Sequence, residues 1–182
     1  MDINVKLPER KSPRAKWIEY NEGMYFITIC THNKTHYFGE IIDEEMRFSK
    51  IGKTLNDELE NTSLHHPHIE IPIFVVMPNH FHSIVTIKKR QDQHTDATRS
   101  VPTKNERLSN GINSDKRTLL STYIGCLKAA VTRYAHTLYE EFKWQPRYHD
   151  HVIRNIDDLN NISQYIKTNV AKWEHDCFYL KR

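Results

Sequence analysis

The sequence predicts an α+β fold, in which helices pack on a small antiparallel sheet. Short segments rich in aromatic and β-branched residues, separated by turn residues, are typical of antiparallel strands. Longer segments with apolar residues at helical spacing indicate helices. Four or five strands joined as hairpins, with three helices beside them, favour an α+β sandwich over a doubly wound parallel sheet.

The first strands and the first helix are expected in the N-terminal third of the chain. Residues 24–32, MYFITICTH, are aromatic and β-branched and predict a strand. Residues 37–48 hold two apolar segments around Asp-Glu-Glu and predict a hairpin. Ser49 is a suitable N-cap for a helix that continues to about Asn61. Its buried face is expected to carry Ile51, Leu55 and Leu59, which are spaced four residues apart.

A second hairpin is expected in the middle of the chain. Residues 69–77, IEIPIFVVM, predict a buried strand. Because Pro72 cannot donate a backbone hydrogen bond, the first half of this strand is expected at an edge or in a bulge. Pro78 and Asn79 favour a tight turn. Residues 80–87, HFHSIVTI, are then the partner strand.

The C-terminal half predicts two helices around an irregular segment. Asp115 is expected to cap a long helix that ends near Tyr139. Residues 144–154 are expected to be compact and irregular, and Asn155 to cap a final helix over residues 156–173. The apolar side of the long helix is expected to hold Leu119, Tyr123, Cys126, Leu127, Ala130 and Tyr134.

The chain is expected to form one domain, residues 17–182, after a basic N-terminal arm, residues 1–16. The arm is expected either to be solvated or to contact phosphates. Residues 91–116 are mostly polar and predict a mobile loop inside the domain. The basic residues of the arm are Lys6, Arg10, Lys11, Arg14 and Lys16.

Composition excludes several classes of protein. With 38% hydrophobic and 27% charged residues and a net charge of +3, the chain is neither collagen-like nor fully disordered. No apolar run approaches the ~20 residues that span a bilayer, and the N-terminus lacks the apolar region of a secretory signal. Cys30, Cys126 and Cys177 are odd in number and widely spaced, so we expect no disulfide framework and a cytoplasmic location.

The segment VVMPNHFHSIV carries a candidate metal site. His80 and His82 are two residues apart on a predicted strand, so both rings leave the same face while Phe81 points to the other. Two imidazoles on one face are half of a metal site and need at least one further ligand. The alternative is that both histidines simply face solvent. His149-Asp150-His151 repeats the spacing in an irregular segment, and the cluster at residues 65–68 is interpreted as surface.

A second pair of candidate residues lies on the final helix. Tyr165 and Asn169 are four residues apart, so they share a helix face. A phenol with a pKa of ~10 becomes a nucleophile beside a metal-polarised electrophile, and an amide oxygen suits Mg²⁺ or Mn²⁺. Taken alone, these residues would be a core aromatic and a helix-end residue. Together with the histidines they predict a divalent cation that polarises a phosphate, and a tyrosine that attacks phosphorus to give a 5′-phosphotyrosine.

Four segments, in order from about residue 17 to residue 173, resemble the single-tyrosine HUH transposases, and most closely the REP-associated tyrosine transposases. The match to the HUH strand is moderately specific by itself, whereas four matches in order are highly specific. One departure is Val170, which stands where the family usually has proline. The four segments are GMYFITICTHNKTHYFGEI, VVMPNHFHSIV, WQPRYHDHVIRNIDDL and YIKTNVAKW.

The resemblance implies a ferredoxin-like HUH fold and a transposase that cleaves and rejoins single-stranded or hairpin DNA. Carried over by position, His80, His82 and Asn169 would bind Mg²⁺ or Mn²⁺, and Tyr165 would be the nucleophile. Relatives of this kind are monomers or homodimers, and both states stay open. DNA contacts are expected from Lys128, Arg133, Arg147 and Arg154.

Two other functions stay open beside this enzyme. One is a domesticated protein of the same fold that binds DNA hairpins without turnover. The other is a zinc hydrolase, which is disfavoured because the strand with the two histidines has no acidic residue and the sequence has no HExxH motif.

Overall fold

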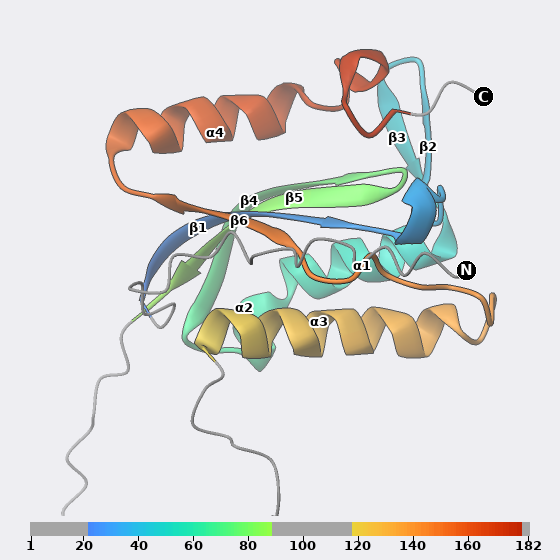
Figure 1. Ribbon diagram of the computed structural model, residues 1–182, viewed down its shortest axis with the longest axis horizontal. Coiled ribbons are helices and arrows are strands. Elements are labelled where there is room, and N and C mark those ends of the chain that lie inside the picture. Colours follow the sequence, from blue (N-terminus) through green and yellow to red (C-terminus); the bar gives the residue numbers. More distant parts are fainter. Residues whose placement is uncertain (1–21, 89–117, 180–182) are drawn as a thin grey trace, which may run out of the picture.

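The computed structural model describes residues 22–88 and 118–179 (Figure 1). The predicted arm at 1–16 and the predicted loop at 91–116 lie outside the described residues. A four-stranded antiparallel sheet forms the centre, in the order β4-β5-β1-β6, and confirms the predicted α+β class. The strands are β1 (Gly23–Cys30), β4 (Ile69–Met77), β5 (His80–Ile87) and β6 (His149–Ile153).

The predicted first hairpin is a separate two-stranded sheet, β2 (Gly39–Ile42) and β3 (Glu45–Phe48). Its turn residues Asp43 and Glu44 have positive φ angles of 52° and 60°, as the two-residue turns that match strand twist require. A short 3₁₀ helix, His32–Lys34, lies between β1 and this hairpin.

Helix α1 (Lys50–Glu60) begins and ends close to the predicted positions. The Ser49 hydroxyl accepts a hydrogen bond from the Gly52 amide at 3.0 Å, which caps the helix. The short helix α2 (Thr62–His65) follows. The apolar residues of α1 predicted to be buried are indeed buried: Ile51, Leu55 and Leu59.

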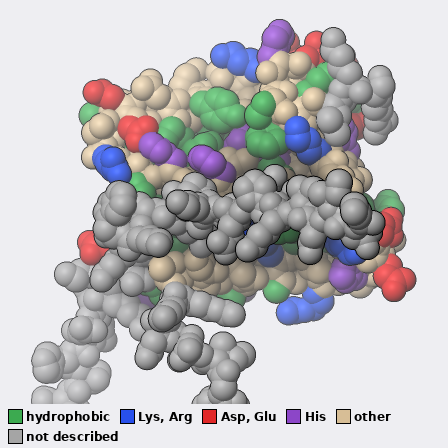
Figure 2. All heavy atoms as spheres, viewed as in Figure 1, with side chains coloured by type: hydrophobic (Ala, Val, Ile, Leu, Met, Phe, Trp, Pro, Cys, Tyr) green, Lys and Arg blue, Asp and Glu red, His purple; other side chains and the backbone are tan. Residues whose placement is uncertain are grey.

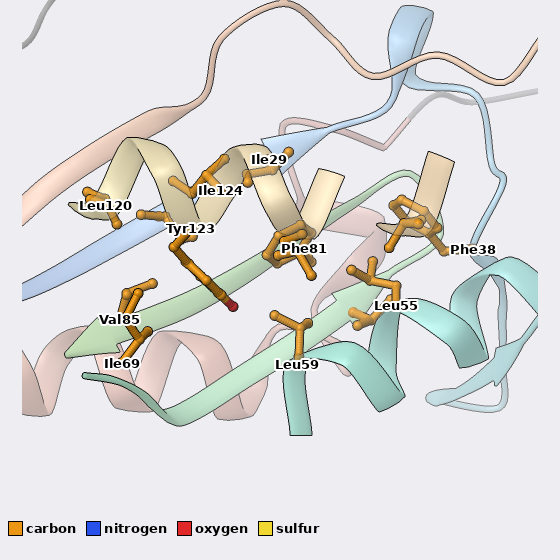
Figure 3. Packing of buried hydrophobic residues seen from close by; sticks show 14 of the residues in the cluster. Ile29, Phe38, Leu55, Leu59, Ile69, Phe81, Val85, Leu120, Tyr123 and Ile124 are labelled. Carbon is orange, nitrogen blue, oxygen red and sulfur yellow. The ribbon is translucent and has the colours of Figure 1, made fainter. Parts of the chain in front are cut away.

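The central strands carry side chains into two layers. On one face, α1 and α3 (Leu119–Ala135) cover the sheet, and Figure 3 shows Tyr123 and Ile124 of α3 near Phe81 of β5. On the opposite face lies α4 (Ile156–Thr168), over a smaller cluster that includes Ile84 (Figure 1). Strand β4 is an edge strand whose register shifts between Glu70 and Ile73, as Pro72 predicted.

Helix α3 differs from its prediction in both ends and in its buried face. Asp115 lies outside the described residues, and the cap is Thr118, whose hydroxyl accepts a hydrogen bond from the Ser121 amide. The helix ends at Ala135 rather than near Tyr139. Because α3 is apolar on more than one side, its spacing could not select the buried side. Cys126 and Tyr134 are exposed, whereas the buried residues are Leu120, Tyr123, Ile124, Leu127, Val131 and Ala135.

The segment before the last helix and the end of that helix were also predicted wrongly. Residues 149–153 form a regular edge strand paired with β1. The first three of these residues, His149, Asp150 and His151, are all polar, so the segment lacks the alternating pattern from which a strand is predicted. Helix α4 begins after its predicted cap, Asn155, but ends at Thr168 and not at Trp173. Beyond Thr168 the hydrogen bonds tighten, and the chain turns so that Asn169 and Trp173 become buried, before a 3₁₀ helix, Trp173–His175.

Candidate active site

Two imidazoles meet on the face of the sheet that α4 covers. The Nε2 atoms of His80 and His82 lie 3.1 Å apart, and the two residues are 0% and 2% exposed. Phe81, between them, packs into the cluster on the opposite face, as the strand period predicted. Figure 2 shows histidine side chains beside hydrophobic ones on the surface under α4.

The neighbours of His80 fix which ring nitrogen is available. The Asn79 amide donates hydrogen bonds to the backbone carbonyls of Lys34 and Phe178, at 3.1 and 3.0 Å. Its oxygen must therefore accept the hydrogen bond from Nδ1 of His80, at 2.8 Å. This proton assignment leaves a lone pair on Nε2, which is the atom that faces His82.

His82 is oriented in a similar way by two residues of β1. Its Nδ1 shares a hydrogen bond of 2.8 Å with the Thr28 hydroxyl, and when Nδ1 carries the proton and donates it to that oxygen as a hydrogen bond, Nε2 is left bare. The ring also stacks on Phe26, with centroids 5.3 Å apart. Burial, and then the charge of His149, lowers the pKa of His82 to about 3, and burial holds the pKa of His80 well below its usual range. Both imidazoles are therefore neutral at physiological pH.

The Tyr165 hydroxyl lies 3.2 Å from Nε2 of His82. Its side chain comes from α4 of the same chain and is 43% exposed. Burial and the charge of Asp176 raise the pKa of the phenol, while a hydrogen bond with Asn169 opposes them. The phenol therefore carries its proton at neutral pH.

Asn169 follows α4 as its C-cap and is 3% exposed. Its side-chain oxygen is buried and has no hydrogen-bond partner among the described residues. A buried amide oxygen without a partner is costly unless a ligand satisfies it. Two bare imidazole nitrogens and this oxygen are donor atoms of the kinds that bind a divalent cation.

Asp176 is a functional candidate that sequence reasoning missed. Its Oδ2 lies 3.9 Å from Nε2 of His80, and its side chain is 4% exposed. One ligand atom each of His80, His82 and Asp176 lies within 4.8 Å of the others. No motif surrounds this aspartate in the sequence, and its position depends on the turn that follows α4.

The predicted DNA-contacting residues are divided between the two faces of the sheet. Lys128 and Arg133 belong to α3, on the face opposite the histidine pair (Figure 1). The Lys128 ammonium donates to the carbonyls of Gln145 and Arg147, at 3.2 and 3.0 Å, and burial lowers its pKa to about 8. Arg133, Arg147 and Arg154 are exposed.

The second HxH pair lies on β6, on the same face as His82. Thr28 pairs with both His82 and His149, and cross-strand partners point to the same side of a sheet. His149 is exposed, and Nε2 of His151 forms a 2.9 Å hydrogen bond with Asp158 of α4. In the cluster at residues 65–68, His66 packs on Tyr123 of α3, away from this face.

Cys30, Cys126 and Cys177 are all free thiols, as expected. None of the helices in residues 22–88 and 118–179 combines the length and the apolar character needed to cross a membrane.

Comparisons with known proteins agree with this fold. No family model matches the sequence. An uncharacterized protein of Haemophilus influenzae is 34% identical over 179 residues, which cover 97% of each chain. Among solved structures, the REP-associated tyrosine transposase bound to a REP hairpin aligns with a TM-score of 0.57 and 20% identity, over 90% of this chain and 74% of that one. The chain therefore belongs to one family with the Haemophilus influenzae protein, and its fold is that of the REP-associated tyrosine transposases, which its motifs resemble.

Proposed function

We propose that this protein is a DNA transposase that cleaves and rejoins single-stranded DNA through a covalent 5′-phosphotyrosine. The observation that carries the proposal is the position of the Tyr165 hydroxyl, 3.2 Å from one of two imidazoles whose Nε2 atoms are 3.1 Å apart. A tyrosine and a metal-ligand pair at this separation can act on the same phosphate.

In this proposal His80, His82 and Asn169 hold Mg²⁺ or Mn²⁺. The cation, when bound, neutralises charge on the scissile phosphate and on the phosphorane that forms from it. The protein prepares the ligands beforehand, because Asn79 fixes the proton on the far nitrogen of His80 and burial keeps both rings neutral.

Tyr165 performs the covalent step. Its phenol oxygen forms the bond to phosphorus, and the bond from phosphorus to the 3′-oxygen of the neighbouring nucleotide breaks. The phenol proton is transferred, overall, to that 3′-oxygen, so the products are a 5′-phosphotyrosine and a free 3′-OH. The reverse reaction with another 3′-OH rejoins a strand and needs no water.

The proposed substrate is single-stranded or hairpin DNA. The related solved structure is bound to a REP hairpin, and Tyr165 is accessible enough to meet a nucleic acid strand. Arg147 and Arg154 flank β6 beside the site and are the better candidates for contacts near the scissile phosphate. Lys128 and Arg133, on the other face, would contact only a DNA element that wraps around the domain.

The test is an adduct assay with single-stranded DNA taken from the sequences that flank the gene, including any inverted repeats there. We expect a metal-dependent protein–DNA adduct that survives denaturation, vanishes with chelator and is absent in Tyr165→Phe. Tyr148→Phe is the matched control, because the Tyr148 hydroxyl forms a hydrogen bond with Ser121 of α3, on the face of the sheet opposite the histidine pair. An adduct that persists in Tyr165→Phe and is lost in Tyr148→Phe would show that the nucleophile is assigned wrongly.

A second candidate function is a domesticated protein that binds DNA hairpins without turnover. The observation in its favour is that both imidazoles are buried, with the Phe178 ring 4.5 Å from that of His80. Hairpin binding without any adduct, under all divalent metals tested, would favour this function.

A further inference from the structure

Asp176 approaches the histidine pair from a part of the chain that has no motif. The segment after α4 returns over β5 and is held there by two hydrogen bonds: the Lys34 ammonium donates to the Cys177 carbonyl at 2.9 Å, and the Asn79 amide to the Phe178 carbonyl. Asp176 lies at the start of this contact, with its carboxylate almost fully buried.

The two oxygens of this carboxylate have different neighbours. Oδ1 accepts a hydrogen bond from the Phe178 amide at 2.7 Å, which closes a local turn. Oδ2 points toward Nε2 of His80, at 3.9 Å, which is beyond hydrogen-bond distance. The Cys177 side chain also hydrogen-bonds to this carboxylate. A role limited to the local turn would use only the first oxygen.

The spacing of the donor atoms suits one cation. With ligand bonds of about 2.1 Å, neighbouring ligands of an octahedral ion lie ~3.0 Å apart and opposite ligands ~4.2 Å apart. The His80–His82 nitrogens are 3.1 Å apart, and the His80–Asp176 atoms are 3.9 Å apart. The three ligand atoms lie within 4.8 Å of one another, so binding one ion requires only a small inward shift of a side chain.

The charge balance of a bound divalent cation also favours Asp176 as a ligand. Two neutral imidazoles and an amide would leave both charges of a buried divalent cation uncompensated by protein, which is unfavourable in a site from which water is excluded. Asp176 supplies one negative charge. Without a cation this carboxylate would oppose the chemistry, because it raises the pKa of Tyr165.

We propose that Asp176 is a ligand of the divalent metal, with Oδ2 joining His80, His82 and Asn169 in a site of two nitrogens and two oxygens. This inference rests on the proposed function, because it concerns the same cation. It has a structural consequence: the metal links β5, the end of α4 and the C-terminal segment, so metal binding stabilises the contact of that segment with the sheet.

The test measures Mn²⁺ binding without DNA, by calorimetry and by electron paramagnetic resonance of free Mn²⁺, in the Tyr165→Phe background. Asp176→Asn keeps an oxygen that can accept from the Phe178 amide but loses the charge. We expect its Mn²⁺ affinity to fall roughly tenfold or more, and the rise in melting temperature on adding Mn²⁺ to shrink. Asp43→Asn, in the exposed β2-β3 turn, is the matched control and should bind Mn²⁺ like the parent protein.

His80→Ala tests the metal site itself, whereas Asp176→Asn tests only whether Asp176 is one of its ligands. If Asp176→Asn binds Mn²⁺ like the parent while His80→Ala loses binding, Asp176 is not a ligand and the proposed function stands. If Asp176→Asn only lowers the melting temperature in chelator, with an unchanged Mn²⁺ affinity, its role is the local turn and the inference fails. If His80→Ala also binds Mn²⁺ like the parent protein, both the metal site of the proposed function and the role of Asp176 in it are wrong.

Discussion

Asn79 and Thr28 determine what the two imidazoles can do. Each holds the Nδ1 side of one ring at 2.8 Å, so that the Nε2 atoms are left to face one another. Such neighbours orient metal ligands and raise their basicity. Asn79 is fully buried and also bonds to the C-terminal segment, so the same amide ties His80 to the segment that carries Asp176.

The burial of these neutral imidazoles predicts that metal-free protein loses stability in acid. Unfolded histidine has a pKa of about 6.5, whereas in the folded protein burial lowers the pKa of His82 to about 3 and that of His80 well below its usual range. Between these values the unfolded chain binds more protons, so stability is complete above about pH 6.5 and falls as the pH falls. Each ring contributes up to about 1.4 kcal/mol per pH unit in this window.

Urea denaturation at pH 7 and pH 5, in the presence of chelator, measures this effect. His82→Gln should show a smaller difference between the two pH values, because one titrating group has been removed. The same dependence on pH in the wild-type protein and in this variant would contradict the prediction.

At the scale of elements, α1 approaches the chain before β2 so closely that one position admits only glycine. A Cβ atom on Gly52 would lie 1.8 Å from the Phe38 carbonyl oxygen and 2.7 Å from its carbon. The same carbonyl accepts a hydrogen bond from the Ser49 amide at 2.9 Å, so the obstacle is held in place.

Gly52→Ala is expected to destabilise the protein by about 1–3 kcal/mol, because α1 must move away from Phe38. Gly125→Ala in α3 is the matched control, since a Cβ atom there meets nothing within 4 Å. Both changes favour the helical state, so Gly125→Ala should stabilise by about 0.5–1 kcal/mol. Urea denaturation of the two variants gives the comparison, and equal effects would show that the contact at Gly52 can relax.

On the scale of the whole molecule, the sheet separates a structural face from the candidate active face. Helices α1 and α3 cover the sheet on one side, where the larger core lies, and α4 covers it on the other (Figure 1). The hydroxyl of Tyr165, in α4, lies 3.2 Å from Nε2 of His82. Tyr165 lies beside His82 of the same chain, so we expect one chain to supply its own nucleophile and its own histidines.

This arrangement predicts that inactive variants do not rescue each other. A mixture of Tyr165→Phe with His80→Ala should form no more DNA adduct than either variant alone, because every chain then lacks one part of its own site. A mixture of wild-type protein with either variant serves as the control and should retain adduct formation in proportion to the wild-type chains. Restored adduct formation in the mixture of variants would mean that α4 is exchanged between subunits in solution.

Local periodicity was enough to predict several features of the site. The strand period places His80 and His82 on one face, and the helical period places Tyr165 of α4 near Asn169, the C-cap of that helix, to which it hydrogen-bonds. The caps Ser49 and Asn155 were also predictable, because capping depends on a side chain and amides only three positions away.

Only the tertiary structure decided which faces are covered and what completes the site. Helix α3 is apolar on two sides, so packing against α1 and the sheet selected Leu120 and Val131 over Cys126 and Tyr134. Asp176 reaches His80 through a turn after α4 whose hydrogen bonds tighten as Trp173 is buried. The sequence by itself determined the side on which each side chain leaves its strand or helix, because backbone geometry is local. Which residues that side chain contacts depends on the packing of segments that are distant in the sequence, and local periodicity does not predict this packing.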